Sequence, residues 1–276
     1  VFAGPGIGVS WVDGRLMKQI ESRCRAAALL ALTLAACGGA ETSSPTSDEP
    51  RDPCENQASG TACTWLGVKG QEGFNGDGHL RYETEVNQLQ DLLFLEDGTA
   101  WFSDFNNHLI REVSPDGTVT SVVGWTDPVF PGDGPPGGAD PNGNPGEDWQ
   151  LFHPTALLHG EDGSVLATCW HNHKVITIDP KAGLVKVRTG GGSEFGRSGF
   201  EGDGGPASAA LFNQPSDAAV DDAGNLYIAD QVNLRVRRVD ASDVIDTIAG
   251  TGKYGTLGDG GPAMSCLLYT SPSPRD

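Results

Sequence analysis

The tripeptide Gly-Asp-Gly occurs four times in the chain, at intervals of 56, 70 and 56 residues. Its aspartates are Asp77, Asp133, Asp203 and Asp259. A motif that returns at spacings of this size indicates supersecondary units that stack on one another in series. The chain is therefore expected to fold as a repeat rather than as a single irregular domain.

A second block of similar sequence lies between these motifs, and three copies align on Gly98, Gly163 and Gly224. Each copy has a polar residue or cysteine six positions after the glycine and an asparagine nine positions after it. These residues are Asp104, Cys169 and Asp230, then Asn107, Asn172 and Asn233. The asparagine is expected to occupy a turn, because its side chain bonds to its own backbone and it tolerates positive φ.

The third copy shows the expected secondary structure best. Short apolar runs at 216–220, 226–230, 234–239 and 244–250 are separated by clusters of Asp, Asn and Gly. Such runs predict strands joined by tight turns, and the 39 glycines and 18 prolines of the chain fit many short elements. Four antiparallel strands per unit predict an all-β fold built from β-propeller blades.

The stretches "GDGGPASAALFNQPSDAAVDDAGNLYIADQVNLRVRRV" and "LEDGTAWFSDFNNHLIREV" resemble the NHL-repeat family, and the second contains Asn-His-Leu at 107–109. The resemblance extends over about residues 61–263. It implies a six-bladed β-propeller, of which residues 61–265 would supply about three blades. The run "CTWLG" at 63–67 is expected to add closing strands.

Residues 17–37 have the layout of a secretory signal. Lys18, Arg23 and Arg25 precede an apolar run at 26–36, which is too short to span a bilayer. The ending Leu-Ala-Ala-Cys resembles the lipobox of bacterial lipoproteins, which implies lipidation of Cys37. The alternative is an ordinary apolar helix with a buried cysteine. We interpret residues 1–37 as an upstream extension, 1–16, followed by a lipoprotein signal peptide.

Two further segments lie outside the predicted blades. Residues 38–60 are acidic and rich in Pro and Ser, which predicts a flexible tether. Residues 266–276, ending in "LLYTSPSPRD", depart from the repeat and are interpreted as a non-native tail. In an exported protein Cys54 and Cys63 could form a disulfide, with two free thiols as the alternative.

The chain has 37 acidic and 18 basic residues, a formal net charge of −19. This charge repels phosphate backbones, so nucleic acid is excluded as a partner. The remaining classes of partner are proteins and small molecules. Membrane contact is expected only through the N-terminal lipid, in the bacterial cell envelope.

The piece "CWHNHK" could form a metal site, because a strand would place Cys169, His171 and His173 on one face. The repeat alignment instead assigns the last residues to the turn that follows Cys169. The turn is the favoured interpretation.

The enlarged loop of the second unit offers hard oxygen ligands to calcium. It has 19 residues between Gly134 and Pro154, against 10 between Gly204 and Pro215. A solvated acidic loop is the alternative, since the spacing does not match an EF-hand. No other cofactor is expected. The candidate calcium ligands are Asp140, Asn142, Asn144, Glu147 and Asp148.

The resemblance also includes enzymes, notably the peptide-amidating lyases, which bind zinc in the central channel. Those lyases carry a histidine directly after the proline that starts the innermost strand. Gln90, Thr155 and Ser216 stand at those positions here, which argues against the lyase in this half of the ring. Candidate channel-facing residues are Asp91, Asp217 and His153.

The sequence therefore favours an exported, lipid-anchored binding or interaction scaffold that is not an enzyme. The alternative is a metal-dependent lyase or lactone hydrolase with its site in the central channel.

Overall fold

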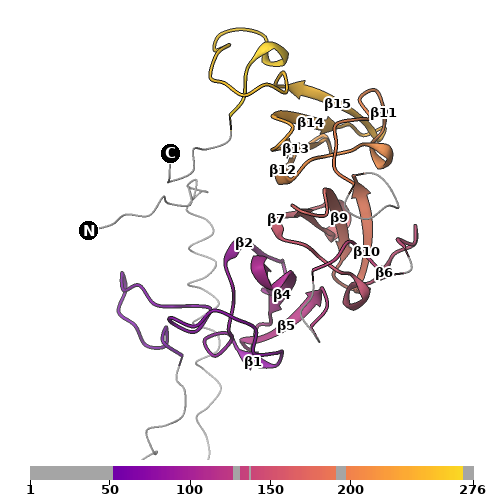
Figure 1. The fold of residues 1–276 in the computed structure, drawn as a ribbon. Helices are drawn as coiled ribbons and strands as arrows, with labels where there is room; N and C mark the ends of the chain where they lie inside the picture. Colours follow the sequence, from indigo (N-terminus) through magenta and orange to yellow (C-terminus); the bar gives the residue numbers. More distant parts are fainter. Residues whose placement is uncertain (1–51, 127–130, 137, 191–196, 270–276) are drawn as a thin grey trace, which may run out of the picture. The chain divides into compact units, whose positions relative to one another are not determined.

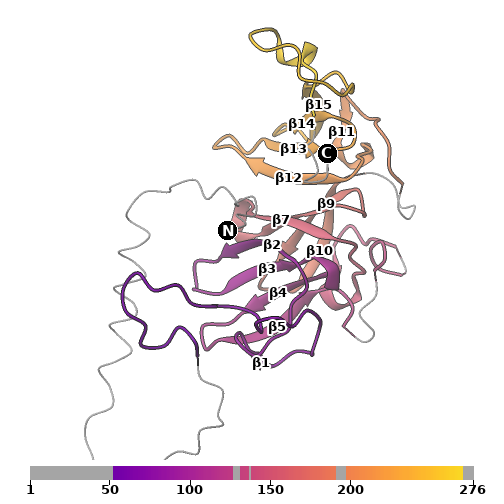
Figure 2. The ribbon, with the colours of Figure 1, turned by 60° about the vertical axis from the view of Figure 1, so that its left-hand side comes forward.

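Three antiparallel sheets of the same topology make up the computed structural model, which describes residues 52–126, 131–136, 138–190 and 197–269. Each sheet is one blade of a β-propeller, and the described residues contain no α-helix. The first main strand of the second blade, Pro154–His159, lies beside the first main strands of the two other blades, Leu89–Phe94 and Pro215–Val220 (Figures 1 and 2).

Each blade has four main strands in sequence order, as the alternation of apolar runs and turns predicts. Blade 1 contains β2 (Leu89–Phe94), β3 (Ala100–Asp104), β4 (Leu109–Val113) and β5 (Thr118–Val123). Blade 2 contains β7 (Pro154–His159), β8 (Val165–Cys169), β9 (Lys174–Asp179) and β10 (Leu184–Thr189). Blade 3 contains β12 (Pro215–Val220), β13 (Leu226–Asp230), β14 (Arg235–Val239) and β15 (Val244–Ala249).

A fifth, two-residue strand extends every blade beyond the four that were predicted. These strands are β1 (His79–Leu80), β6 (Asn144–Pro145) and β11 (Gly205–Pro206), and each pairs with the last strand of its blade. Five short 3-10 helices complete the described elements: η1 (Phe105–Asn107), η2 (Gly146–Asp148), η3 (Glu161–Gly163), η4 (Ala207–Ala209) and η5 (Ala263–Ser265).

The hydrophobic core lies between the faces of successive blades. Trp101 and Ile110 of blade 1 pack with Ile176 of blade 2 in one buried cluster. Leu166 and Val175, on the other face of blade 2, pack with residues of blade 3 in a second cluster. Blade 2 buries both faces of its sheet, so β8 and β9 are nearly continuous buried strands. In β13 of blade 3, buried and half-buried residues alternate.

The three Gly-Asp-Gly aspartates that precede a blade each form an ion pair with a cation of that blade. Asp77 lies 3.3 Å from Arg111, Asp203 lies 2.7 Å from Arg237, and Asp133 lies 2.6 Å from Lys174. The arginine or lysine belongs to the third main strand of the blade. The motif that defined the repeat therefore ties the loop before each blade to the sheet.

Blades 1 and 3 also contain a completely buried ion pair. Asp104 pairs with Arg111 at 3.4 Å, and Asp230 pairs with Arg237 at 3.5 Å. Blade 2 has Cys169 at the position of the aspartate and Ile176 at that of the arginine. The two substitutions occur together because either one alone would leave a buried charge without its partner.

The repeated asparagine lies in the turn between the second and third main strands, as predicted. Its own φ is not positive, however, and its side chain bonds to another segment. The residue after it adopts positive φ, at 56° in His108, 55° in His173 and 53° in Leu234. The Asn233 amide donates to the carbonyl of Gly199 at 2.7 Å and to the Asp230 carboxylate. The asparagine thus joins the turn to an upstream loop, because nearby acceptors outcompete its own backbone.

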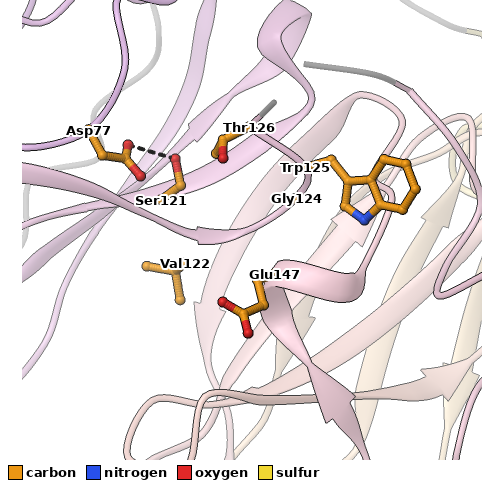
Figure 3. Close-up of a pocket in the computed structure, with 7 residues that line it drawn as sticks. All are labelled: Asp77, Ser121, Val122, Gly124, Trp125, Thr126 and Glu147. Atoms are coloured by element: carbon orange, nitrogen blue, oxygen red, sulfur yellow. Dashed lines mark hydrogen bonds between the residues drawn. The ribbon is translucent and has the colours of Figure 1, made fainter. Parts of the chain in front are cut away.

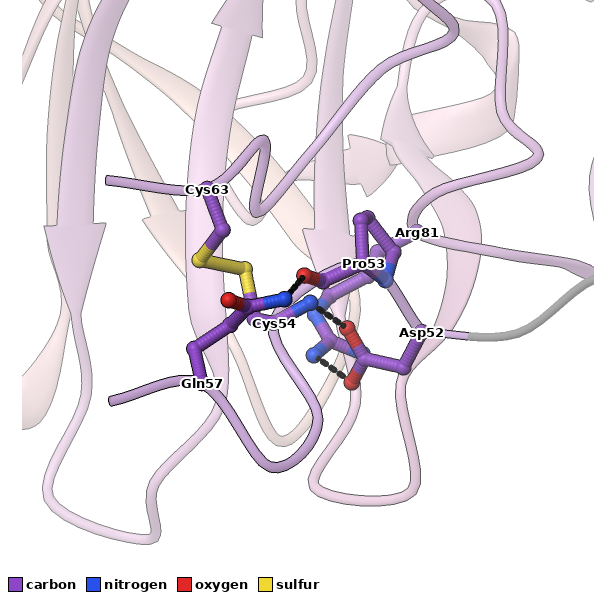
Figure 4. The surroundings of a disulfide bond; sticks show 6 residues. All are labelled: Asp52, Pro53, Cys54, Gln57, Cys63 and Arg81. Atoms are coloured by element: carbon purple, nitrogen blue, oxygen red, sulfur yellow. Dashed lines mark hydrogen bonds and ion pairs between the residues drawn. A yellow bond between two sulfur atoms is a disulfide. The ribbon is translucent and has the colours of Figure 1, made fainter. Parts of the chain in front are cut away.

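Cys54 and Cys63 form a disulfide in the segment that leads into blade 1 (Figure 4). Asp52 in the same segment forms an ion pair with Arg81.

The run at 63–67 forms no strand, contrary to the prediction. Trp65 and Leu66 instead pack against a buried cluster of blade 1 that consists of Ala100, Phe102, Val113 and Val119. An apolar run that meets a face of the sheet can be buried by packing alone, without joining an edge.

The expected signal peptide and Cys37 lie outside the described residues, as do most of the tether and positions 270–276 of the tail. No helix in the described ranges reaches the length and apolar character needed to cross a bilayer.

Candidate functional site

A pocket of about 420 Å³ opens at the junction of blades 1 and 2 (Figure 3). Asp77 accepts a hydrogen bond from the Ser121 hydroxyl at 2.9 Å, and the carboxylate of Glu147 points toward the same opening from η2. Trp125 also lines the pocket, and in this view its indole extends away from Asp77 and Ser121. The lining residues are Asp77, Ser121, Val122, Gly124, Trp125, Thr126 and Glu147.

Two of these residues are particular to this junction. Glu147 is the middle residue of η2, and the corresponding residues of η4 and η5 are Ser208 and Met264. Trp125 follows a glycine of positive φ that recurs as Gly190 and Gly250, yet Gly191 and Thr251 stand after those. A residue needed for the fold of the blade would recur, so Trp125 and Glu147 are candidates for a functional role.

The enlarged loop of the second unit holds the five residues proposed for calcium. Asn144 accepts the backbone N–H of Asp140 at 2.8 Å, and Asp140 accepts that of Asn142 at 2.7 Å. Glu147 and Asp148 lie in η2, where Glu147 lines the pocket. Two of the proposed oxygens thus already stabilise the loop. The calcium site stays a prediction.

A second candidate is a cluster of rings at the turns of blades 1 and 2, which we call the histidine cluster. His153 stacks on Phe105 with ring centroids 4.3 Å apart. The His171 ring lies 4.7 Å from that of His153, and their Nδ1 atoms are 2.5 Å apart. The cluster consists of Phe105, His108, Phe152, His153, Trp170 and His171.

The backbone holds the two central histidines close together. Trp170 donates its N–H to the carbonyl of His153 at 3.0 Å, and His171 donates to that of Phe152 at 3.1 Å. His153 has a φ of 58° and directly precedes Pro154, the first residue of β7. This backbone conformation fixes the direction in which the His153 side chain extends from the backbone.

The histidines that follow the repeated asparagine connect neighbouring blades. His108 Nδ1 accepts the backbone N–H of His153 at 3.4 Å, and His173 Nδ1 accepts that of Gln214 at 3.0 Å. Burial lowers the pKa of His108 and of His153 to about 4, and it also lowers the pKa of His171 and His173. These imidazoles are therefore neutral at pH 7, and the Nδ1 lone pairs of His108 and His173 accept the bonds to the next blade.

The structure separates Cys169, His171 and His173, the three residues that a single strand would have brought together as a metal site. Cys169 ends β8 and is fully buried, which raises the pKa of its thiol to about 12. His171 and His173 lie in the following turn, one in the histidine cluster and the other bonded to Gln214. Within the described ranges, no group of three or more His, Cys, Asp or Glu side chains is placed to hold a metal ion.

The two candidate channel carboxylates occupy equivalent positions in β2 and β12. Asp91 accepts the N–H of Leu157 in blade 2 at 2.7 Å and that of Leu92 at 2.8 Å. Loss of solvent and the negative charge of Asp91 raise the pKa of Asp217. The carboxylates are therefore close enough to interact, while Asp91 also ties two blades together. His153, the third candidate, belongs to the histidine cluster.

Sequence reasoning missed the convergence of His153 and His171. Both positions depart from the repeat: His153 aligns with Gln88 and Gln214, and His171 aligns with Asn106 and Val232. Two histidines that replace other residues in adjoining turns of one blade were the available signal.

Comparisons with known proteins give only distant similarities. No family model matches the chain. The chain is 30% identical over 99 residues to Protein SUPPRESSOR OF QUENCHING 1, chloroplastic, of Arabidopsis thaliana. The match covers 36% of this chain and 9% of that protein. The matched segment is therefore a small part of that relative.

Solved structures with similar folds share 12–15% of their sequence with the chain. Virginiamycin B lyase from Staphylococcus aureus matches 60% of this chain and 43% of its own, with a TM-score of 0.37. A gluconolactonase from Xanthomonas campestris matches 59% and 48%, with a TM-score of 0.40. An auxiliary nutrient binding protein from Bacteroides ovatus matches 75% and 49%, with a TM-score of 0.47. The chain spans about half of these proteins, and the similarities assign it no activity.

Proposed function

We propose that this chain belongs to an exported, lipid-anchored β-propeller of the NHL-repeat type, which binds ligands or partner proteins at the junctions of its blades. The repeated Gly-Asp-Gly and Asn-containing blocks support the NHL assignment. The signal-like run that ends at Cys37 supports the anchor. The full propeller is proposed to have six blades.

The observation that carries the binding role is the pocket between blades 1 and 2. It combines the carboxylates of Asp77 and Glu147 with the indole of Trp125. Among the described residues Glu147 has no ion pair, whereas Asp77 is paired with Arg111. A tryptophan and an unpaired carboxylate that line one pocket suit an organic ammonium group, and a cation–π contact with the indole contributes about 0.5–2 kcal/mol.

The binding role predicts that small ammonium ions bind in the pocket. Tetramethylammonium and n-butylammonium should bind the chain in calorimetric titrations, and uncharged n-butanol should not. Trp125→Ala is expected to weaken binding by about 2- to 30-fold, the equivalent of the cation–π energy. Glu147→Gln should weaken it by about 1.5- to 5-fold, as an exposed ion pair would.

Asp148→Asn is the matched control, because Asp148 is an exposed carboxylate in the same 3-10 helix that does not line the pocket. Equal losses from Asp148→Asn and Glu147→Gln would indicate general attraction to the acidic surface and would contradict a pocket.

The lipid anchor makes a separate prediction. Expression of the chain in a bacterium fed with a labelled fatty acid should give a labelled protein in the membrane fraction. Cys37→Ser should abolish the label and release the protein, because the thioether to the lipid can no longer form. Cys24→Ser, within the same segment, should change neither result, and label retained after Cys37→Ser would exclude this anchor.

The alternative of a metal-dependent enzyme in the channel has less support. Asp91 is the best placed carboxylate for such a role, and both of its oxygens accept backbone N–H groups. Its position is accounted for by the contact between two blades.

A further inference from the structure

The pair His153 and His171 is a feature that neither the fold nor the pocket requires. His108 and His173 have equivalent bonds to the next blade, so their role belongs to the repeat. His153 and His171 have no such counterparts, because glutamine, asparagine and valine occupy their positions in the other blades. Residues specific to one blade that contact each other point to a function of their own.

We propose that His153 and His171 bind one late first-row transition metal ion, such as Zn²⁺ or Cu²⁺, through their Nδ1 atoms. The two nitrogens face each other at 2.5 Å. Imidazole nitrogen is a favoured ligand for these ions. The site lies apart from the ammonium pocket, since the two share no residue.

The protonation of the pair fits an exchangeable site. Two neutral imidazoles with facing Nδ1 atoms share one proton, so one ring donates and the other accepts. A metal ion takes a lone pair from each Nδ1, and the donating ring then carries its proton on Nε2 instead. The exchange of tautomer needs no other reactant.

The geometry requires only a small adjustment. Metal–nitrogen bonds of about 2.0–2.1 Å at a tetrahedral angle place two ligand nitrogens about 3.4 Å apart. The rings would therefore move apart by roughly 1 Å. Both are half-buried, and the backbone bonds between segments 152–153 and 170–171 hold their Cα atoms in place.

The aromatic surroundings favour a defined site over a loose surface contact. Phe105 stacks on His153, and the Trp170 ring lies 4.3 Å from that of His171. These rings restrict the imidazoles to few orientations, which reduces the entropy lost on binding. The pair supplies two ligands, so the remaining coordination positions are left for water or an exogenous ligand.

The test uses the full chain, purified without a histidine tag and stripped of metal with a chelator. Calorimetric titration with Zn²⁺ alone should show one binding site per chain. His153→Gln and His171→Asn should each weaken that site about tenfold or more. Both replacements already occur at the equivalent positions, as Gln88, Gln214 and Asn106, so the variants are expected to fold normally.

His159→Gln is the control, because His159 is an exposed histidine outside the cluster. Electron paramagnetic resonance with Cu²⁺ should show two imidazole nitrogens in the original chain and one in either variant. Failure of the original chain to bind Zn²⁺ would overturn the proposal. So would unchanged affinity in the two variants, or an equal loss of affinity in His159→Gln.

Discussion

Replacing Arg237 with isoleucine is expected to lower the free energy of unfolding by about 3–5 kcal/mol. Arg237 is completely buried, pairs with Asp230 and Asp203, and lies between the rings of Phe200 and Phe212. Its removal leaves the buried Asp230 carboxylate without a cation. Chemical denaturation followed by circular dichroism would measure the loss.

Adding Asp230→Cys to Arg237→Ile should recover much of that stability. Blade 2 already contains this combination as Cys169 and Ile176. There Asn172 accepts the Phe152 N–H at 2.8 Å, a role that Asp230 performs in blade 3 for Asn213. Asn233 is present to take over the same contact.

Arg188→Ile supplies the matched control, since Arg188 forms a partly exposed ion pair with Asp243. Its loss should cost less than about 1 kcal/mol. If the double variant is less stable than Arg237→Ile alone, the Cys–Ile pair of blade 2 cannot replace the Asp–Arg pair of blade 3.

The second large effect is a loss of stability in acid, caused by the histidines that connect blades. His108 and His173 accept backbone N–H groups through Nδ1, and protonation of that nitrogen removes the acceptor. Burial lowers the pKa of His108 from 6.5 to about 4, so the folded protein binds fewer protons than the unfolded chain. This contribution is complete above pH 6.5 and is lost as the pH falls toward 4.

The expected size follows from the shift. One pKa unit corresponds to about 1.4 kcal/mol, and the partial exposure of His108 reduces its share to about 1–2 kcal/mol. Unfolding free energies should be measured between pH 4 and 7.5 in the presence of a chelator. The difference between the original chain and His108→Leu/His173→Leu isolates these groups from the carboxylates.

Leucine is a suitable replacement, because Leu234 occupies the same position with the same positive φ in blade 3. The variant should be less sensitive to pH than the original chain across this window. Parallel curves for the two proteins would rule out the histidines as the cause.

Much of the fold could be predicted from the order of residues. In the third repeat the runs at 216–220, 226–230, 234–239 and 244–250 match β12, β13, β14 and β15 within one residue at each end. Alternating turns and apolar runs are local signals, and they determine strands and hairpins directly. The two-residue fifth strands carry no such signal, because each exists only through pairing with the last strand of its blade.

The candidate sites were less accessible to sequence reasoning. Glu147 was singled out as a calcium ligand, and in the structure it lines a pocket with Asp77, 70 residues earlier in the chain. His153 was expected near a channel, and it lies beside His171 and Phe105. Contacts between turns of neighbouring blades depend on how the sheets pack, which no local pattern specifies.

The sequence by itself determined the repeat, the strands and the positions at which one unit departs from the others. The same residue types recur at equivalent positions because each blade packs its sheet against neighbouring blades. Only the tertiary structure decided which of the departing residues meet. Cys169 and Ile176 replace a buried ion pair, whereas His153 and His171 form a new contact. The members of each pair stand in different strands or turns of blade 2. The pairing of β8 with β9 and the backbone bonds between segments 152–153 and 170–171 bring their side chains together.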